Sequence, residues 1–324
     1  MKAITQRAYG SADVLEVQDL PMPVAGDKEV MVKVEAAGVD TAVLHMMTGR
    51  PLAMRLAGYG LRKPKKRIPG MAFAGRVMEV GAGVTSFSIG DSVFGVAQGA
   101  FAEFACARVD RIAPTPAGLS ALQGSALPIS ATTAFKTVHD TGRITPGQGV
   151  LVIGAGGSVG SYAVQIAKAF GAEVTGVCGT SKLEFVRSLG VKEAVDYTRD
   201  DLTRFGGQFD LVIDTGGGRS LKTLRRLLNR KGSLVIVGAD GVGGPLLGGA
   251  DRQMRAAIVS LFVPQRLSGV MSIDTTAALN ELTKLVVTNK VRPIIDRVFP
   301  LADAANAIRY LESRAAMGKV VISI

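Results

Sequence analysis

The sequence has few of the residues from which metal sites and disulfide frameworks are built. Its 324 residues include two cysteines, two histidines and no tryptophan. Cys106 and Cys178 are too few for a disulfide-stapled fold and are typical of a reducing compartment. Tetrahedral zinc needs several Cys, His or carboxylate ligands. His45 and His139 are more typical of loop or interface positions, so we expect no metal.

Long apolar runs are also missing. No stretch approaches the roughly 20 apolar residues needed to cross a bilayer, and the first residues lack the apolar segment of a signal peptide. We therefore expect a cytoplasmic protein without membrane association. With 47% hydrophobic and 20% charged residues over 324 positions, the chain is long enough for two globular domains.

Acidic residues are absent from one segment. Between Asp40 and Glu79 the chain carries eight Lys or Arg residues, five of them within residues 62–67. Together with the net charge of +11, this segment favours anionic ligands. A solvated loop is the simplest interpretation. A nucleic-acid surface is disfavoured because no aromatic residue is interleaved within 62–67 for base stacking.

Two periodicities divide the chain. Up to about Val109, short β-like runs are split by Gly and Pro, which is typical of a β-rich domain. From about Val150, apolar strands alternate with helix-period segments, which predicts a parallel sheet with crossover helices. The expected strands are 150–153, 173–178, 194–197, 209–215, 233–238 and 319–324; the expected helices are 159–170, 181–189 and 303–313; residues 241–249 are expected to form a connecting loop.

The glycine-rich segment Gly154–Gly160 lies between an expected strand and an expected helix. It contains Ala-x-Gly-x-x-Gly, the dinucleotide-binding pattern with alanine at its first position. Small residues there let a pyrophosphate approach the N–H groups of the helix start. The same segment also fits the Gly-x-Ser-x-Gly turn of α/β-hydrolases. That interpretation fails because both histidines precede Ser158, whereas the hydrolase histidine follows its serine.

The end of the second parallel strand indicates which nicotinamide cofactor binds. NAD-binding folds place an Asp or Glu there, on the ribose hydroxyls. Here the strand is followed by Thr180, Ser181 and Lys182, with no acid. Ser181 also begins a Ser-x-x-Glu capping box. Hydroxyls and an ammonium suit a 2′-phosphate, so NADPH is expected rather than NADH.

With these motifs in view, the chain resembles the medium-chain dehydrogenase/reductase superfamily, in its zinc-independent quinone oxidoreductase-like branch. The resemblance covers essentially the whole length. It is carried by Ala74–Val77, Val80 to Phe87, Gly90–Gly95, Gly99–Phe104, Pro128–Ala134 and Asp196–Tyr197.

The resemblance implies an α/β fold: a GroES-like β-rich catalytic domain, 1–125 with 267–324, and a Rossmann NADPH-binding domain, 126–266. It also implies a homodimer. The implied cofactor-binding residues are Thr133, Gly157, Ser158, Val159, Thr180, Ser181, Lys182, Tyr197, Gly238, Phe262 and Arg314. Zinc-dependent relatives have a cysteine after a Gly-Val pair and a later His-Glu pair. Here these places hold Asp40, after Gly38-Val39, and Met71-Ala72, after Gly70.

Without a Lewis acid, reduction of an activated acceptor is easier than alcohol oxidation. We expect hydride transfer from NADPH to a quinone, enone or similar small carbonyl compound. Asp40 and Tyr59 lie in segments that the resemblance places near the substrate, but neither is assigned as a proton donor. The alternatives are an enoyl-thioester reductase, whose substrate phosphates the 62–67 loop would bind, and an NADPH-binding protein that binds nucleic acid.

Overall fold

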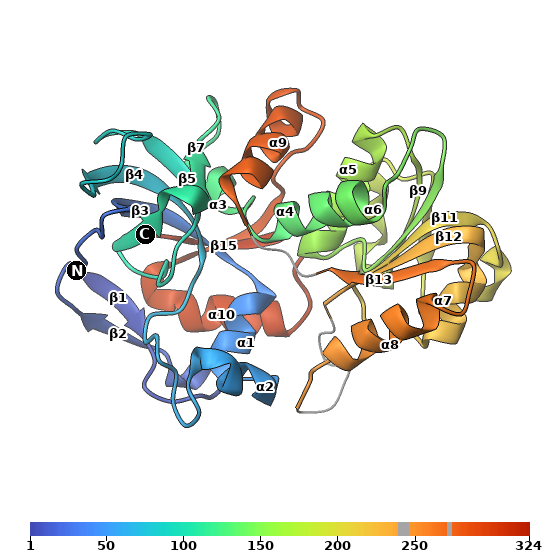
Figure 1. The fold of residues 1–324 in the computed structure, drawn as a ribbon, viewed down its shortest axis with the longest axis horizontal. Helices are drawn as coiled ribbons and strands as arrows, with labels where there is room; N and C mark the ends of the chain where they lie inside the picture. Colours follow the sequence, from blue (N-terminus) through green and yellow to red (C-terminus); the bar gives the residue numbers. More distant parts are fainter. Residues whose placement is uncertain (239–245, 271–273) are drawn as a thin grey trace. The chain divides into compact units, whose positions relative to one another are not determined.

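The computed structural model describes residues 1–238, 246–270 and 274–324, and the chain forms two compact units (Figure 1). The first unit contains Met1–Thr132, Ile273–Thr288 and Pro293–Ile324, and the second contains Thr133–Ser272 and Asn289–Arg292. Both chain ends therefore belong to the first unit. The expected boundaries, after residues 125 and 266, lie a few residues earlier in the chain. Residues 241–245 of the expected connecting loop lie outside the described residues.

The first unit is built on β-strands. They are β1 (Lys2–Thr5), β2 (Glu16–Asp19), β3 (Glu29–Val39), β4 (Ala72–Val80), β5 (Ser92–Val96), β6 (Phe104–Arg108), β7 (Ile112–Pro114), β14 (Ile295–Pro300) and β15 (Lys319–Ser323). The main sheet has the order β14-β15-β3-β4-β5-β7, and β6 pairs with β3. Strand β15 runs antiparallel to β3, with Val320 opposite Val39. This register brings Lys319, the first residue of β15, beside Asp40, which follows β3.

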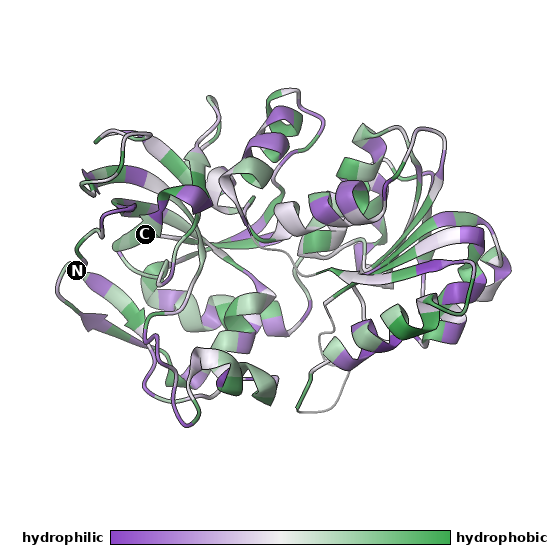
Figure 2. Cartoon of the chain, in the orientation of Figure 1, coloured by the Kyte–Doolittle hydropathy of each residue, from purple (hydrophilic) through white to green (hydrophobic). Residues whose placement is uncertain are grey.

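The α-helices that accompany these strands are α1 (Thr41–Thr48), α2 (Leu52–Met54), α3 (Ala121–Ser125), α4 (Ser130–Phe135), α9 (Thr276–Val287) and α10 (Ala304–Glu312). Helix α4 begins in the first unit and ends in the second. Hydrophilic and hydrophobic residues alternate around α9 (Figure 2), and its buried residues are Leu279, Leu282 and Val286. That spacing of three and four residues places them on one helical face.

The second unit contains a six-stranded parallel sheet. Its strands are β8 (Gly149–Ile153), β9 (Glu173–Cys178), β10 (Glu193–Asp196), β11 (Phe209–Asp214), β12 (Leu228–Val237) and β13 (Arg266–Val270), and its helices are α5 (Ser158–Ala169), α6 (Leu183–Ser188), α7 (Leu221–Leu227) and α8 (Ala250–Ser260). The order is β10-β9-β8-β11-β12-β13, and every pairing is parallel. The chain order reverses direction at β8, which is where doubly wound folds bind ligands.

The sequence predicted most of these strands well. The 173–178 strand is confirmed without change, whereas β12 begins five residues before the predicted 233. The capping box at Ser181 is wrong. Residues Thr180–Lys182 form a short 3-10 turn, and α6 begins at Leu183 without a side-chain cap. Among the described residues, no helix combines the length and apolar character needed to span a bilayer.

Candidate functional site

The glycine turn, Gly154–Gly160, joins the end of β8 to the start of α5. A Cβ on Gly160 would lie 2.1 Å from the Gly154 carbonyl oxygen, so only glycine permits this approach of helix and strand. Gly157 is the N-cap residue of α5, and a Cβ there would meet only the same oxygen, at 3.4 Å. Gly160 therefore serves packing, whereas Gly157 leaves the helix start open to a ligand. Ser158 and Val159 form the first turn of α5.

A basic side chain lies directly against this turn. A Cβ on Gly156 would be 2.8 Å from Cδ of Lys182, which places the Lys182 stem on the turn. Close by, a Cβ on Gly179 would lie 3.6 Å from the ring of Tyr197. The Arg219 guanidinium stands 5.7 Å from the centre of the Tyr197 ring. Two cations and a tyrosine therefore follow the carboxyl ends of β9, β10 and β11, and the Lys182 stem lies on the glycine turn.

Arg219 is a site residue that the sequence reasoning missed. It follows β11 after a run of three glycines, without a recognisable motif. The structure fixes its backbone through Arg252, whose guanidinium donates to the Arg219 carbonyl at 2.6 Å and pairs with Asp214 at 2.6 Å. Arg252 and Asp214 are both buried. Asp214 and Arg252 are 38 positions apart in the sequence, so no local sequence pattern predicts their ion pair.

The Thr180 hydroxyl has a hydrogen-bond partner within the protein. Its hydroxyl donates to the Asp196 carboxylate at 2.5 Å and is therefore not free to donate to a phosphate. Asp196 also accepts from the backbone N–H and the hydroxyl of Thr198. The Thr180 hydrogen bond is the largest of the effects that lower the pKa of Asp196, which keeps its carboxylate ionised and already satisfied. Ser181 is exposed on the same turn.

The other cofactor candidates lie on several different elements. Gly238 follows β12 with a left-handed φ of 68°, and Phe262 follows α8 with 80% of its surface exposed. Thr133 lies on α4, where its carbonyl accepts from the Thr137 hydroxyl at 2.7 Å. Arg314 belongs to the first unit and follows α10 with a φ of 58°.

In the first unit, three buried polar side chains form a charge cluster: Asp40, Ser130 and Lys319. Asp40 is 3% exposed, Ser130 2% and Lys319 0%. The Lys319 ammonium donates to Oδ1 of Asp40, to Oγ of Ser130 at 3.2 Å and to the carbonyl of Val39 at 3.4 Å. Ser130 donates to the same Asp40 oxygen at 2.5 Å. Among the described residues, Oδ2 of Asp40 has no hydrogen-bond partner.

A second buried carboxylate, that of Asp274, lies at the start of α4, the helix to which Ser130 belongs. Asp274 is 6% exposed and accepts from the backbone N–H of Ile129, at 3.0 Å, and from the hydroxyl of Thr132. Desolvation is the main reason that the pKa of Asp274 is raised, and the charge of Asp40 adds to the shift. Two buried acids therefore bind the first residues of α4, the helix that continues to Thr133. Neither Asp274 nor Lys319 was singled out from the sequence.

Tyr59 and the two histidines have other contacts in the structure. Tyr59 is 44% exposed, and its carbonyl accepts from the Lys65 N–H at 2.9 Å and from the Tyr9 hydroxyl at 3.0 Å. His45 Nδ1 lies 3.0 Å from the Arg50 carbonyl oxygen. His139 stacks on Phe135 at 5.0 Å. In the part of the chain that the structure describes, no three His, Cys, Asp or Glu side chains gather around a common point.

Comparison with known proteins identifies the fold and the family. Residues 26–117 match the alcohol dehydrogenase GroES-like domain, and residues 189–322 match the zinc-binding dehydrogenase family. A chloroplastic quinone-oxidoreductase homolog of Spinacia oleracea is 30% identical over 99% of this chain and 98% of its own. A 2-methylene-furan-3-one reductase of Solanum lycopersicum is 30% identical, over 99% of this chain and 79% of its own.

A solved structure agrees. Escherichia coli quinone oxidoreductase complexed with NADPH is 26% identical, has a TM-score of 0.84 and covers 100% of both chains. The matching domains, full-length relatives and shared fold confirm the resemblance drawn from the sequence. The chain belongs to the medium-chain dehydrogenase/reductase superfamily, in its quinone oxidoreductase-like branch.

Proposed function

We propose that this protein is an NADPH-dependent oxidoreductase that reduces a quinone, an enone or a similar small carbonyl compound. One observation carries the proposal. The stem of Lys182 lies against Gly156, so a cationic side chain and the open N-terminus of α5 share one place. Helix N-termini bind phosphates through unpaired N–H groups and the helix dipole, and an ammonium beside them adds a point charge. The quinone oxidoreductase and furanone reductase relatives support the acceptor class.

The choice of NADPH follows from the residues around Lys182. No acid lies between the end of β9 and Lys182, and the acid on the neighbouring strand, Asp196, already accepts hydrogen bonds from Thr180 and Thr198. Lys182 and Arg219 offer two cations to a 2′-phosphate, beside Tyr197. Arg suits bidentate phosphate recognition, and Lys supplies a compact charge. The quinone oxidoreductase structure with NADPH supports the same choice.

We propose that the reaction proceeds without zinc, although the second family match carries a zinc-binding description. The donor set does not fit the ion. Asp40 stands where zinc-dependent relatives have a cysteine ligand, and its Oδ1 accepts from Lys319 and Ser130. A divalent cation on that carboxylate would be repelled by the buried ammonium. A bound nicotinamide would supply the hydride from its C4 atom.

The protein's own groups would then bind and orient the reactants. The amides of Gly157, Ser158 and Val159 hold a pyrophosphate, and Lys182 and Arg219 hold the 2′-phosphate. As the family resemblance implies, Thr133 and Phe262 would contact the nicotinamide. We further propose a homodimer in the cytoplasm. Each chain's two cysteines form no disulfide, and burial raises the pKa of each thiol to about 11, which disfavours the reactive thiolate.

The test is NADPH oxidation by the purified protein against quinones, enones, aldehydes and enoyl-CoA esters, with and without a zinc chelator. We expect turnover with quinones or enones, a preference for NADPH over NADH, and no effect of the chelator. Turnover confined to enoyl-CoA esters would establish the alternative reductase. Absence of turnover with every acceptor, or inactivation by the chelator, would refute the proposal.

A further inference from the structure

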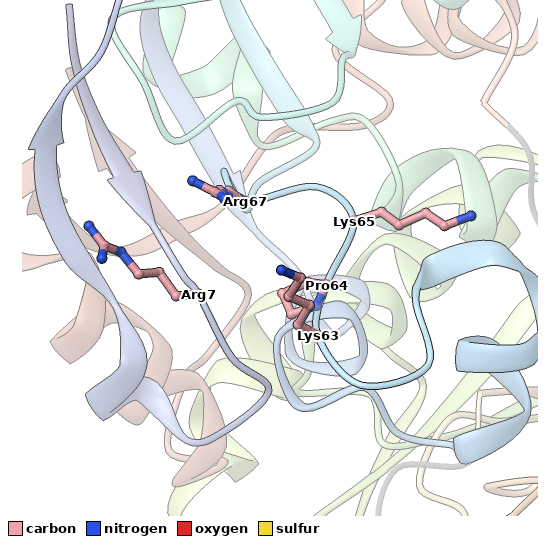
Figure 3. Close-up of a pocket in the computed structure, with 5 residues that line it drawn as sticks. All are labelled: Arg7, Lys63, Pro64, Lys65 and Arg67. Atoms are coloured by element: carbon pink, nitrogen blue, oxygen red, sulfur yellow. The ribbon is translucent and has the colours of Figure 1, made fainter.

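A cavity of about 440 Å³ in the first unit is lined by Arg7, Lys63, Pro64, Lys65 and Arg67 (Figure 3). Four of the five lining residues are cations and none is an acid. Arg7 follows β1, whereas the others come from the 62–67 loop, so two distant segments supply the charge. The volume lies within the range of roughly 300–1,000 Å³ that is usual for small-molecule sites.

Within the described part of the chain, the cations of this cavity have no partner. No side chain of Arg7, Lys63, Lys65 or Arg67 forms an ion pair or hydrogen bond with another of the described residues. Elsewhere in the unit, exposed cations do pair, as Arg108 does with Asp110 at 2.7 Å. Like charges gathered without a counter-ion repel one another and raise the local concentration of anions.

The backbone around the cavity is held in place. The Gln6 N–H donates to the Arg67 carbonyl at 2.8 Å, which ties the Arg7 segment to the loop. At the other end of the loop, the Tyr9 hydroxyl donates to the Gly60 carbonyl at 2.7 Å. Gly60 has a φ of 112°, and a Cβ there would lie 2.2 Å from the Lys63 carbonyl oxygen, so the turn into the loop requires glycine. Pro64 is buried and stiffens the loop.

We propose that this basic cavity is a binding site for a small phosphate-bearing anion of about diphosphate size, distinct from the glycine turn. Arg7 and Arg67 present guanidinium forks, which match phosphate oxygens, and Lys63 adds a point charge from the loop. In Figure 3 the Lys65 side chain extends away from those of Arg7 and Arg67. The principal contacts are therefore Arg7, Lys63 and Arg67. No aromatic residue lines the cavity, so it lacks the stacking surface that single-stranded nucleic acid requires.

The proposal does not depend on the hydride-transfer reaction. The phosphate could belong to a free compound or to a phosphate-bearing carbonyl substrate, and the same residues would bind either. The experiment therefore has a binding arm and a kinetic arm.

In the binding arm, pyrophosphate is titrated calorimetrically into protein saturated with NADP⁺, which occupies the glycine turn. The variant Lys63→Gln with Arg67→Gln removes one Lys and one Arg. The matched control, Arg230→Gln with Lys231→Gln, removes the same two charges from exposed positions at the start of β12. We expect the Kd to rise at least about tenfold in the first variant, to stay within about twofold in the control, and to rise with added salt.

Lack of wild-type binding, or equal weakening in both variants, would overturn the proposal. So would single-stranded RNA that binds more tightly than pyrophosphate with an affinity that grows with length. If the double variant fails to fold, Arg7→Gln alone replaces it. In the kinetic arm, an enoyl-CoA ester is compared with a phosphate-free enone. If the cavity variant has a higher KM than the wild type for the ester but not for the enone, the site binds the substrate's phosphates. If neither KM changes in the variant, the site binds a free phosphate compound.

Discussion

The glycine turn of the second unit and the charge cluster of the first unit are built in opposite ways. The turn uses backbone: Gly157 opens the start of α5, and Gly160 lets the helix approach β8. The cluster uses buried side-chain charge: Lys319, with no exposed surface, neutralises Asp40. The close approach at Gly160 tolerates no added atom, whereas a buried ion pair tolerates no loss of either charge. The two regions should therefore respond differently to substitution.

The largest effect is expected at the charge cluster. Lys319→Met would leave the Asp40 carboxylate buried without a counter-charge, which should lower the free energy of unfolding by about 3–5 kcal/mol. Urea unfolding measures this. The double variant with Asp40→Asn removes both charges and should recover most of the loss. Lys192→Met is the control, because the Lys192–Glu173 pair is exposed and should cost about 1 kcal/mol or less. Equal losses for Lys319→Met and the control would contradict this account.

The next effect separates packing from ligand approach at the glycine turn. In Gly160→Ala the new Cβ meets the Gly154 carbonyl, so the free energy of unfolding should fall by about 1–3 kcal/mol. Gly157→Ala has room for its Cβ and should keep the stability of the wild type. Its methyl group would nevertheless stand where the pyrophosphate approaches, so NADPH binding, followed by nicotinamide fluorescence, should weaken. If Gly157→Ala bound NADPH normally, the phosphate would not lie on this turn.

A smaller effect is expected on cofactor choice. Lys182→Gln should raise the Kd for NADPH about tenfold and leave the Kd for NADH nearly unchanged, because only NADPH carries the 2′-phosphate. Arg219→Gln tests the residue that the sequence did not reveal and should act in the same direction. Arg226→Gln, an exposed arginine on α7, is the control. Equal weakening of both cofactors would place these cations elsewhere than at the 2′-phosphate.

The smallest effect concerns the second acid at α4. Burial raises the pKa of Asp274 in the folded state above its usual 3.8. Between pH 3.8 and this raised pKa, the folded state therefore binds more protons than the unfolded state. Wild-type stability should therefore fall as the pH rises through that interval. Asp274→Asn lacks this slope and should become more stable relative to the wild type as the pH rises. Unfolding measured from pH 3.5 upward tests this.

Asp13 supplies the opposite control. Its hydrogen bond from Arg309 lowers its pKa, so its contribution to stability is present above 3.8 and is lost as the pH falls towards the lowered value. Asp13→Asn should therefore lose stability relative to the wild type as the pH rises towards 3.8, so this variant is also measured below pH 3.5. If the stability of both variants relative to the wild type changed with pH in the same direction, the causes assigned to the two pKa shifts would be contradicted.

The sequence by itself determined the second unit in most of its parts. Unbroken apolar runs predicted β8, β9 and β11, and the spacing of the glycines predicted the turn at α5, because strand, turn and helix are consecutive in the chain. The family resemblance was likewise readable from local motifs. The sequence also showed the 62–67 charge run, but not the cavity, because Arg7 belongs to another segment.

Only the tertiary structure decided which side chains share a site. Lys319 and Asp40 are 279 positions apart, and they meet because β15 pairs antiparallel with β3. Thr180 is directed to Asp196 because β9 and β10 are neighbours, which no pattern around Thr180 announced. Backbone-based sites are encoded by adjacent residues and can be read locally. Sites made from buried charges depend on strand pairing, because each charge is tolerated only when folding brings its partner to it.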